Sequence, residues 1–145
     1  MAQTLTREEL SALAKFSSPT LSNAIETFGV RPADAGFAGS EIRALFPELG
    51  AMVGYAATVR IRAAQPGSPD SGGDMFLRAY WPAIVDTPSP TVVVEDLDPE
   101  PIGALIGEVN ANVYQALGCV DTVMCGGVRD VEEMRAVGCY AFATA

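Results

Sequence analysis

An arginine and an aspartate stand side by side at Arg129-Asp130, directly after two glycines at 126–127. A guanidinium group binds a carboxylate through two parallel hydrogen bonds, and a carboxylate can hold a hard divalent cation. Glycine lets the backbone approach a ligand closely, and a helix that follows offers free N–H groups at its start. The pattern predicts a site for an anionic oxo acid and a metal. The structural alternative is a surface salt bridge in which Asp130 caps its own helix.

The chain contains no histidine. This excludes Ser-His-Asp and Cys-His hydrolases, histidine-based zinc sites and histidine proton shuttles. Any metal must be held by carboxylates, carbonyls and water, which favours Mg²⁺ or Mn²⁺. The three cysteines lack Cys-x-x-Cys spacing and are interpreted as reduced, buried residues. A catalytic Cys125 beside the glycine pair is an alternative, but it would have no histidine partner.

With 145 residues, of which 49% are hydrophobic, the chain is expected to form one soluble domain with a sizeable core. Its net charge of −9 argues against nucleic acid or an anionic membrane surface as the main partner. The sequence shows no signal peptide and no apolar run long enough to span a bilayer. We therefore expect a cytoplasmic protein.

The first half of the chain predicts two helices and a strand. Thr6 and Glu9 form a capping box at the start of a short helix. A second helix is expected to begin at Ser18-Pro19 and to stop at Gly29. After an irregular stretch with a short extended piece at 41–45, residues 50–63 alternate between apolar and polar side chains, which predicts a half-buried strand.

The middle of the chain holds the least regular patterns. The polar loop at 65–73 is either a surface connection or an active-site flap. A helix is expected to be capped by Asp74 and to be kinked or ended by Pro82. Residues 91–94 predict a buried strand. Four carboxylates follow it and are either cation ligands or a solvated loop, namely Glu95, Asp96, Asp98 and Glu100.

The last 41 positions alternate between helix and strand. We expect a helix at 105–117, a strand at 120–125, a helix at 131–137 and a strand at 139–144, following the strand at 91–94. Such a βαβαβ run implies a parallel sheet with right-handed crossovers. Ligands collect at the carboxyl ends of strands in these sheets, and residues 126–130 lie at such an end.

The stretch GEVNANVYQALGCVDTVMCGGVRDVEEMRAVGCYAFA resembles the G-E/D-L-x-A…A-x-x-x-G…G-x-V-R-D…G-x-P-V-F-A pattern of the RraA-like family. SPTLSNAIETFG is similar to that family's T-x-S-D-A-L…G helix, and GYAATVRIRA to its G-x-A-x-T-V strand. The family includes 4-hydroxy-4-methyl-2-oxoglutarate aldolases and protein inhibitors of ribonuclease E. The resemblance implies a swivelling β/β/α sandwich of the phosphohistidine-domain-like type, assembled as a homotrimer.

For the aldolase branch, the resemblance implies Mg²⁺- or Mn²⁺-dependent cleavage of 4-hydroxy-2-oxo acids to pyruvate, with decarboxylation of oxaloacetate as a side activity. Arg129 would bind the 2-oxo-dicarboxylate substrate and steady the enolate, Asp130 would hold the metal, and Glu108 would lie near the metal-bound water. The substrate carboxylate would bind at the start of the preceding helix, at Gly107, Val109 and Asn110.

The inhibitor branch gives the alternative, a non-catalytic protein that binds and inhibits a ribonuclease through an acidic surface. The family pattern also continues with further strands beyond the point at which this chain stops. The resemblance therefore implies either a fragment or a shortened family member.

Overall fold

A computed structural model of the chain describes residues 4–62, 76–98 and 103–144. The predicted flap at 65–73, the predicted cap Asp74 and the carboxylate of Glu100 lie outside these residues. The chain divides into two compact units, residues 1–40 and 41–145. The expectation of one domain stays a prediction. Within the described part of the chain, no helix combines the length and the apolar character that crossing a membrane requires.

The first unit contains α1 (Arg7–Leu13) and α2 (Ser18–Glu26). The capping box is confirmed, because the Glu9 N–H donates to the Thr6 hydroxyl at 3.2 Å and the Thr6 N–H donates to the Glu9 carboxylate at 2.7 Å. The predicted cap of α2 was wrong by one residue. Ser17 is the cap and accepts from the Thr20 N–H, so the proline falls within the first turn, where it is tolerated.

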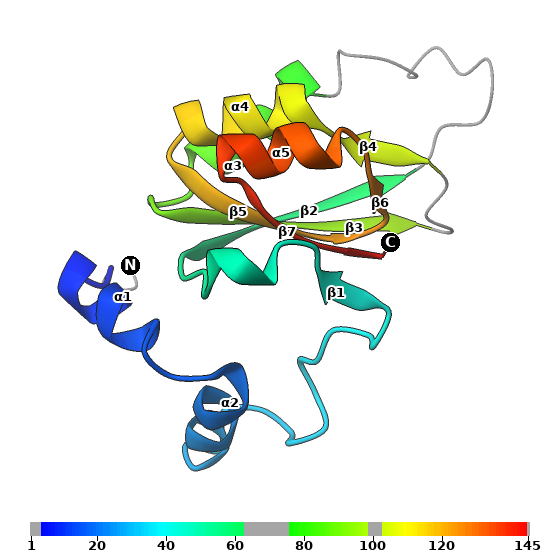
Figure 1. The fold of residues 1–145 in the computed structure, drawn as a ribbon. Coiled ribbons are helices and arrows are strands. Elements are labelled where there is room, and N and C mark those ends of the chain that lie inside the picture. Colours follow the sequence, from blue (N-terminus) through cyan, green and yellow to red (C-terminus); the bar gives the residue numbers. More distant parts are fainter. Residues whose placement is uncertain (1–3, 63–75, 99–102, 145) are drawn as a thin grey trace. The chain divides into compact units, whose positions relative to one another are not determined.

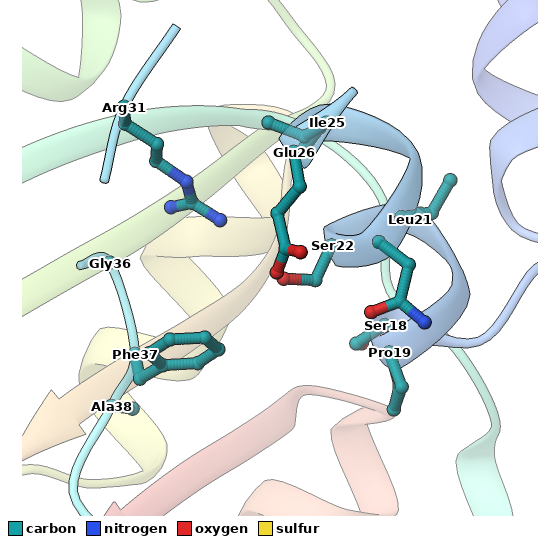
Figure 2. A pocket seen from close by; sticks show the side chains of 11 residues that line it. Ser18, Pro19, Leu21, Ser22, Ile25, Glu26, Arg31, Gly36, Phe37 and Ala38 are labelled. Carbon is teal, nitrogen blue, oxygen red and sulfur yellow. The ribbon is translucent and has the colours of Figure 1, made fainter. Parts of the chain in front are cut away.

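A hollow of about 520 Å³ lies between α2 and residues 31–38 of the same unit. Figure 2 shows the Arg31 guanidinium and the Phe37 ring directed toward this space. Its lining is mainly apolar, and the residues are Ser18, Pro19, Leu21, Ser22, Asn23, Ile25, Glu26, Arg31, Gly36, Phe37 and Ala38. None of the predicted site residues lines it.

The second unit is built on a five-stranded sheet with the order β1-β7-β5-β3-β2. The strands are β1 (Ile42–Ala44), β2 (Tyr55–Arg62), β3 (Thr91–Asp98), β5 (Cys119–Cys125) and β7 (Tyr140–Thr144). Strands β2, β3, β5 and β7 are parallel, and β1 pairs with β7 in the antiparallel direction. The predicted parallel βαβαβ run is therefore confirmed.

Three helices lie over one face of this sheet, namely α3 (Trp81–Val85), α4 (Glu108–Ala116) and α5 (Val131–Val137) (Figure 1). The core between the two layers includes Ile84 of α3, Tyr114 of α4 and Met134 of α5. Alternation on β2 is also confirmed, because Ala57 is buried and its neighbour Thr58 is exposed. A short 3₁₀ helix, η1 (Pro47–Leu49), follows β1.

One of the two alternatives predicted for Pro82 is wrong, and so is one predicted strand boundary. Pro82 does not end a helix. Residues Phe76–Tyr80 form a π-helical turn, η2, that runs directly into α3, and Pro82 stands in the first turn of α3 where no N–H is needed. The strand predicted at 91–94 extends to Asp98, because β3 pairs with β2 on one side and β5 on the other.

The helix predicted from residue 105 begins later, at Glu108. Residues Ala104–Ile106 form a short strand, β4, so Leu105 and Ile106 are not part of the helix. The buried residues of α4 are Ala111 and Tyr114, whereas Val109 is 70% exposed. The predicted start was too early, because the apolar pattern continues across the boundary between strand and helix.

Candidate active site

Two short strands bring the predicted site residues together. β4 (Ala104–Ile106) leads into α4, and β6 (Gly127–Val128) leads into Arg129. The two strands pair in parallel, with Ala104 opposite Gly127 and Ile106 opposite Val128. The Arg129 N–H then donates to the Ile106 carbonyl at 2.9 Å. This pairing, which the sequence did not reveal, places the start of α4 beside the Arg129-Asp130 pair.

Gly107 fits this junction because it has no side chain. A Cβ at this position would lie 2.4 Å from Asp130 Oδ2 and 2.8 Å from Arg129 Cγ. Its φ of −155° is extended backbone, so the requirement for glycine is steric. The carboxylate of Asp130 and the stem of Arg129 therefore lie against the Gly107 backbone.

The side chain of Asp130 binds the first residue of the neighbouring helix, α4. Its Oδ2 accepts a hydrogen bond from the Glu108 N–H at 3.2 Å, at the first position of α4. Asp130 is the N-cap residue of α5, yet its side chain makes no capping bond to that helix. The structural alternative was a helix-start salt bridge in which Asp130 caps its own helix, and only its capping part is wrong, because the salt bridge between Arg129 and Asp130 is present. The Asp130 backbone is left-handed, with φ 55° and ψ 45°, a conformation that costs energy for a residue other than glycine.

The charged groups at this junction face solvent. The side chains of Arg129 and Asp130 are 66% and 42% exposed, and Arg129 Nε lies 3.7 Å from Asp130 Oδ2. Glu108 is exposed as well. An ion pair this long and this exposed contributes little stability, so the arginine is available to a ligand.

The first turn of α4 supplies N–H groups in the same place. In the first turn of a helix the N–H groups have no acceptor within the helix, and Asp130 takes only that of Glu108. Val109 is exposed, and the Asn110 side chain turns back to donate to the Leu105 carbonyl at 3.4 Å. The N–H groups of Val109 and Asn110 are thus the ones suited to an anionic ligand, and the helix dipole favours negative charge there.

The oxygen donors at the junction fit a hard divalent cation. Asp130 has an exposed carboxylate held in place through one oxygen, and Glu108 adds a second exposed carboxylate from the adjoining helix. Mg²⁺ commonly binds through one or two carboxylates while keeping several waters. Among the described residues, no group of three or more acidic, cysteine or histidine side chains could hold a metal, so such a cation would depend on water and substrate oxygens.

The acidic run that follows the strand at 91–94 does not form one cluster. Glu95 is only 2% exposed and points into the core, whereas Asp96 is exposed and pairs with Arg60 at 3.3 Å. Successive residues of a strand point to opposite faces, so these two carboxylates cannot share an ion. The interpretation of the run as a set of cation ligands is wrong for these two.

Glu95 instead belongs to a buried polar cluster that the sequence prediction missed. Its Oε1 accepts from the hydroxyls of Tyr80 and Tyr114, both at 2.7 Å, and from the hydroxyl of Thr122 at 3.1 Å. Burial raises the pKa of the Glu95 carboxyl above its ordinary value of 4.5, although the three hydrogen bonds oppose this rise. The available signal was parity, because Thr91, Val93 and Glu95 alternate onto the buried face of β3.

The three cysteines are free, as predicted. Cys119 and Cys139 are buried, and Cys125 at the end of β5 is half-buried. Burial raises the pKa of the Cys119 thiol to about 11, so it is a poor nucleophile at neutral pH.

Comparison with known proteins gives the family. Residues 18–145 match the family described as RraA-like: Aldolase/RraA, and the chain belongs to this family. The family contains both enzymes and ribonuclease inhibitors. No curated protein sequence matches the chain.

Two solved structures share the fold. One, from a study of novel cellulases from microbes associated with the gut ecosystem, has a TM-score of 0.74 and 16% identity over 99% of this chain. The other is Streptomyces coelicolor RraAS2, an unusual member of the RNase ES inhibitor RraA protein family, with a TM-score of 0.69 and 21% identity over 99% of this chain. This chain spans 61% of the first protein and 65% of the second. The α/β fold expected of an RraA-like protein is confirmed.

Proposed function

We propose that this chain is a divalent-cation-dependent lyase that cleaves 4-hydroxy-2-oxo dicarboxylic acids, such as 4-hydroxy-4-methyl-2-oxoglutarate, to pyruvate and also decarboxylates oxaloacetate. The observation that carries the proposal is the junction of β4 and β6. It brings Arg129, Asp130 and the first turn of α4 together at the surface. A basic side chain, an oxygen ligand for a cation and free N–H groups thus converge on one place.

The proposed reaction breaks the bond between C3 and C4 of the substrate. The proton of the 4-hydroxyl leaves, the C4 oxygen becomes a carbonyl, and the electron pair of the broken bond forms an enolate on the pyruvyl fragment. A proton from solvent then reaches C3 and gives pyruvate. In oxaloacetate the same electron pair is released as CO₂ departs.

Each site residue has a role in this scheme. Arg129 presents its guanidinium to the oxygen on which negative charge develops, which stabilises the transition state more than the ground state. The N–H groups of Val109 and Asn110 hold the substrate carboxylate. The Glu108 carboxylate accepts the hydroxyl proton, directly or through a water. Gly107 leaves the space in which these groups meet.

Mg²⁺ or Mn²⁺ would be held by Asp130, with Glu108 near its water ligands. When bound, such a cation acts as a Lewis acid at the pyruvyl oxygen. We also propose that the active form is a homotrimer, as the family resemblance implies. Size-exclusion chromatography with light scattering would measure the mass of the assembly.

The decisive experiment measures pyruvate released from oxaloacetate and from 4-hydroxy-4-methyl-2-oxoglutarate, with Mg²⁺, with Mn²⁺ and with EDTA. Arg129→Ala is expected to lower kcat/KM by about 100- to 1,000-fold, because it removes a preorganised positive charge. Arg43→Ala, an equal loss of charge at an exposed position on β1, is the matched control and should keep full activity. Absence of metal-dependent pyruvate release from folded protein would refute the lyase proposal.

A second candidate is a ribonuclease-binding protein without catalytic activity. Two observations favour it, the fold shared with a member of an RNase inhibitor family and the net charge of −9. Titration of the chain into a ribonuclease of the RNase E type would show saturable inhibition under this proposal. Arg129→Ala should then leave inhibition unchanged, whereas under the first proposal it should lower kcat/KM for pyruvate release by about 100- to 1,000-fold.

A further inference from the structure

The Glu95 cluster is a buried titratable group that the proposed reaction does not use. Glu95 lies on β3, Tyr80 on η2, Tyr114 on α4 and Thr122 on β5, so four elements meet at one carboxyl group. All four residues are buried, with at most 2% exposure. Of the two carboxyl oxygens, Oε1 faces all three hydroxyls, while Oε2 is buried and has no hydrogen-bond partner among the described residues.

The number of protons in this cluster is too small if Glu95 is ionised. Three oxygens form a closed triangle, because each phenol contacts Glu95 Oε1 and the Tyr80 and Tyr114 hydroxyls also contact each other. Each phenol carries one proton, so the two together can fill only two of the three edges. A third proton, placed on the carboxyl group, completes the triangle. Thr122 fills its own contact with its own hydroxyl proton.

The surroundings of Glu95 also disfavour a negative charge. The pKa of its carboxyl is raised by burial and lowered by hydrogen bonds from the hydroxyls of Tyr114, Tyr80 and Thr122. No lysine or arginine in the described part of the chain is among the groups that shift this pKa. Burial raises the pKa of the Tyr80 hydroxyl, and the thiol of Cys119 on β5 acts electrostatically on Tyr80 and adds to this rise. Strand β2 contributes two apolar residues, Ala57 and Ile61, to the same core. An ionised carboxylate without a cation is costly in such a place.

We propose that Glu95 is held as a neutral carboxylic acid whose own proton closes a ring of hydrogen bonds with Tyr80 and Tyr114, and that loss of this proton opens the ring and loosens α4 from the sheet. The inference goes beyond the lyase proposal and does not depend on it. It assigns to the core a proton-linked contact between α4, which also carries Glu108, and strand β3.

The pH dependence follows from the direction of the pKa shift. Burial raises the pKa of Glu95 in the folded protein above the ordinary 4.5, so the folded state binds more protons between the two values. The stability that this proton contributes is fully present below pH 4.5 and is lost as the pH rises through the folded pKa. Within that window the folding equilibrium constant should fall by about tenfold per pH unit for one proton.

The test compares Glu95→Gln with the wild type and with Asp96→Asn in the complete chain. Glutamine keeps the shape and a hydrogen-bond donor but cannot ionise, and Asp96 is the exposed neighbour on the same strand. Urea unfolding is followed at intervals from pH 4 to pH 9. Glu95→Gln should remove the loss of stability above pH 4.5, whereas Asp96→Asn should keep the wild-type profile. Parallel profiles for wild type and Glu95→Gln would overturn the proposal.

Two measurements on the wild type keep the test sharp if Glu95→Gln fails to fold. The ¹³C shift of the Glu95 side-chain carboxyl should show that this group titrates at a pH above its ordinary pKa of 4.5. Hydrogen exchange of the Tyr114 amide should accelerate as the Glu95 signal changes to the ionised form. The inference would be contradicted if the Glu95 carboxyl of the folded chain titrated at or below its ordinary pKa of 4.5, or if exchange of the Tyr114 amide did not follow the Glu95 titration.

Discussion

Asp130 and Glu95 are two carboxylates of the second unit, in opposite surroundings. Strand β5 leads through β6 to Asp130, whose side chain is 42% exposed and touches a helix N–H and an arginine. Strand β3 carries Glu95, which is 2% exposed and whose hydrogen-bond partners in the described part of the chain are hydroxyl groups. Water and the arginine beside it leave the first carboxylate open to ligands. Burial raises the pKa of the second.

The difference lies in the backbone as much as in the side chains. Asp130 stands in a left-handed conformation after a short strand, at a point where the chain turns from sheet to helix. Glu95 stands in the middle of a strand with neighbours on both sides. A turn at a strand end gives a carboxylate access to solvent, whereas the helix-covered face of a central strand, on which Glu95 lies, denies it. We therefore propose that the same chemical group serves ligand binding in one place and proton storage in the other.

The largest expected effect concerns the exposed carboxylate, Asp130, and its contact with Gly107. Gly107→Ala would place a methyl group 2.4 Å from Asp130 Oδ2 and 2.8 Å from Arg129 Cγ, so both side chains must move. A displacement of about 1 Å in a catalytic group costs roughly 100-fold in rate, and we expect this loss in kcat/KM for pyruvate release. Far-UV circular dichroism should show that the chain still folds.

The matched control for this change is Gly127→Ala on β6. A Cβ there meets its nearest atom, the Gly103 carbonyl oxygen, at 3.3 Å, which a small shift can relieve. Its effect on kcat/KM should be much smaller. Equal losses in the two variants would mean that the junction is sensitive to any added methyl group, and the steric role assigned to Gly107 would be lost.

The next largest effect concerns the buried Glu95 cluster. Tyr114→Phe removes a hydroxyl that contacts both Glu95 and Tyr80, and it leaves buried oxygens short of a partner. We expect a loss of about 1–3 kcal/mol in the free energy of unfolding. The double variant with Glu95→Gln should lose less than the sum of the two single variants, because both changes act on one network.

Tyr140→Phe provides the reference for that cycle. The Tyr140 hydroxyl donates to the Leu49 carbonyl, outside the Glu95 cluster. Urea unfolding of the four proteins in each cycle gives the coupling energies. Tyr140→Phe should be additive with Glu95→Gln to within about 0.5 kcal/mol. Additivity in both cycles would show that Glu95 and Tyr114 do not form one network.

A third change separates the two roles of Asp130. Asp130→Ala removes the carboxylate that accepts the Glu108 N–H and keeps a side chain in the left-handed conformation. Asp130→Gly removes the same carboxylate but relieves the backbone strain. The glycine variant should therefore be more stable than the alanine variant by about 1 kcal/mol. Both variants should lose the metal-dependent release of pyruvate.

Urea unfolding of the two variants tests this order of stability, and isothermal titration with Mg²⁺ and Mn²⁺ tests the loss of the cation ligand. If alanine were as stable as glycine, the left-handed backbone at position 130 would carry no strain. If either variant bound the cation like the wild type, Asp130 would not be its ligand.

The sequence was sufficient to predict the frame of the second unit. Apolar alternation and glycine stops correctly predicted the strands of the parallel run, and the order of elements implied their direction. These are local signals with a fixed period, so one sequence suffices to interpret them. The Arg129-Asp130 pair and Gly107 were also identified before the structure showed that they meet.

The contacts between distant residues were beyond such signals. Strands of two or three residues, such as β6 and β4, carry no detectable period, so the junction that assembles the site was missed. The side chain of Asp130 caps a helix 22 residues away in sequence, which no local capping rule describes. Glu95 was grouped with its acidic neighbours because composition outweighed parity, although its place on a β-branched strand predicted burial.

The smallest expected effect concerns Asp96, a third carboxylate. It tests whether burial, rather than the presence of a carboxylate on β3, explains the behaviour of Glu95. It follows Glu95 on β3 but lies on the opposite face, where it pairs with Arg60 at 3.3 Å and both side chains are more than half exposed. Solvent and salt screen such a pair, so Asp96→Asn should change the free energy of unfolding by less than about 0.5 kcal/mol. Urea unfolding at low salt and at high salt should show that added salt reduces even this difference. A large effect of Asp96→Asn would mean that removing any carboxylate from β3 disturbs the sheet, and burial would no longer explain why Glu95 differs from Asp130.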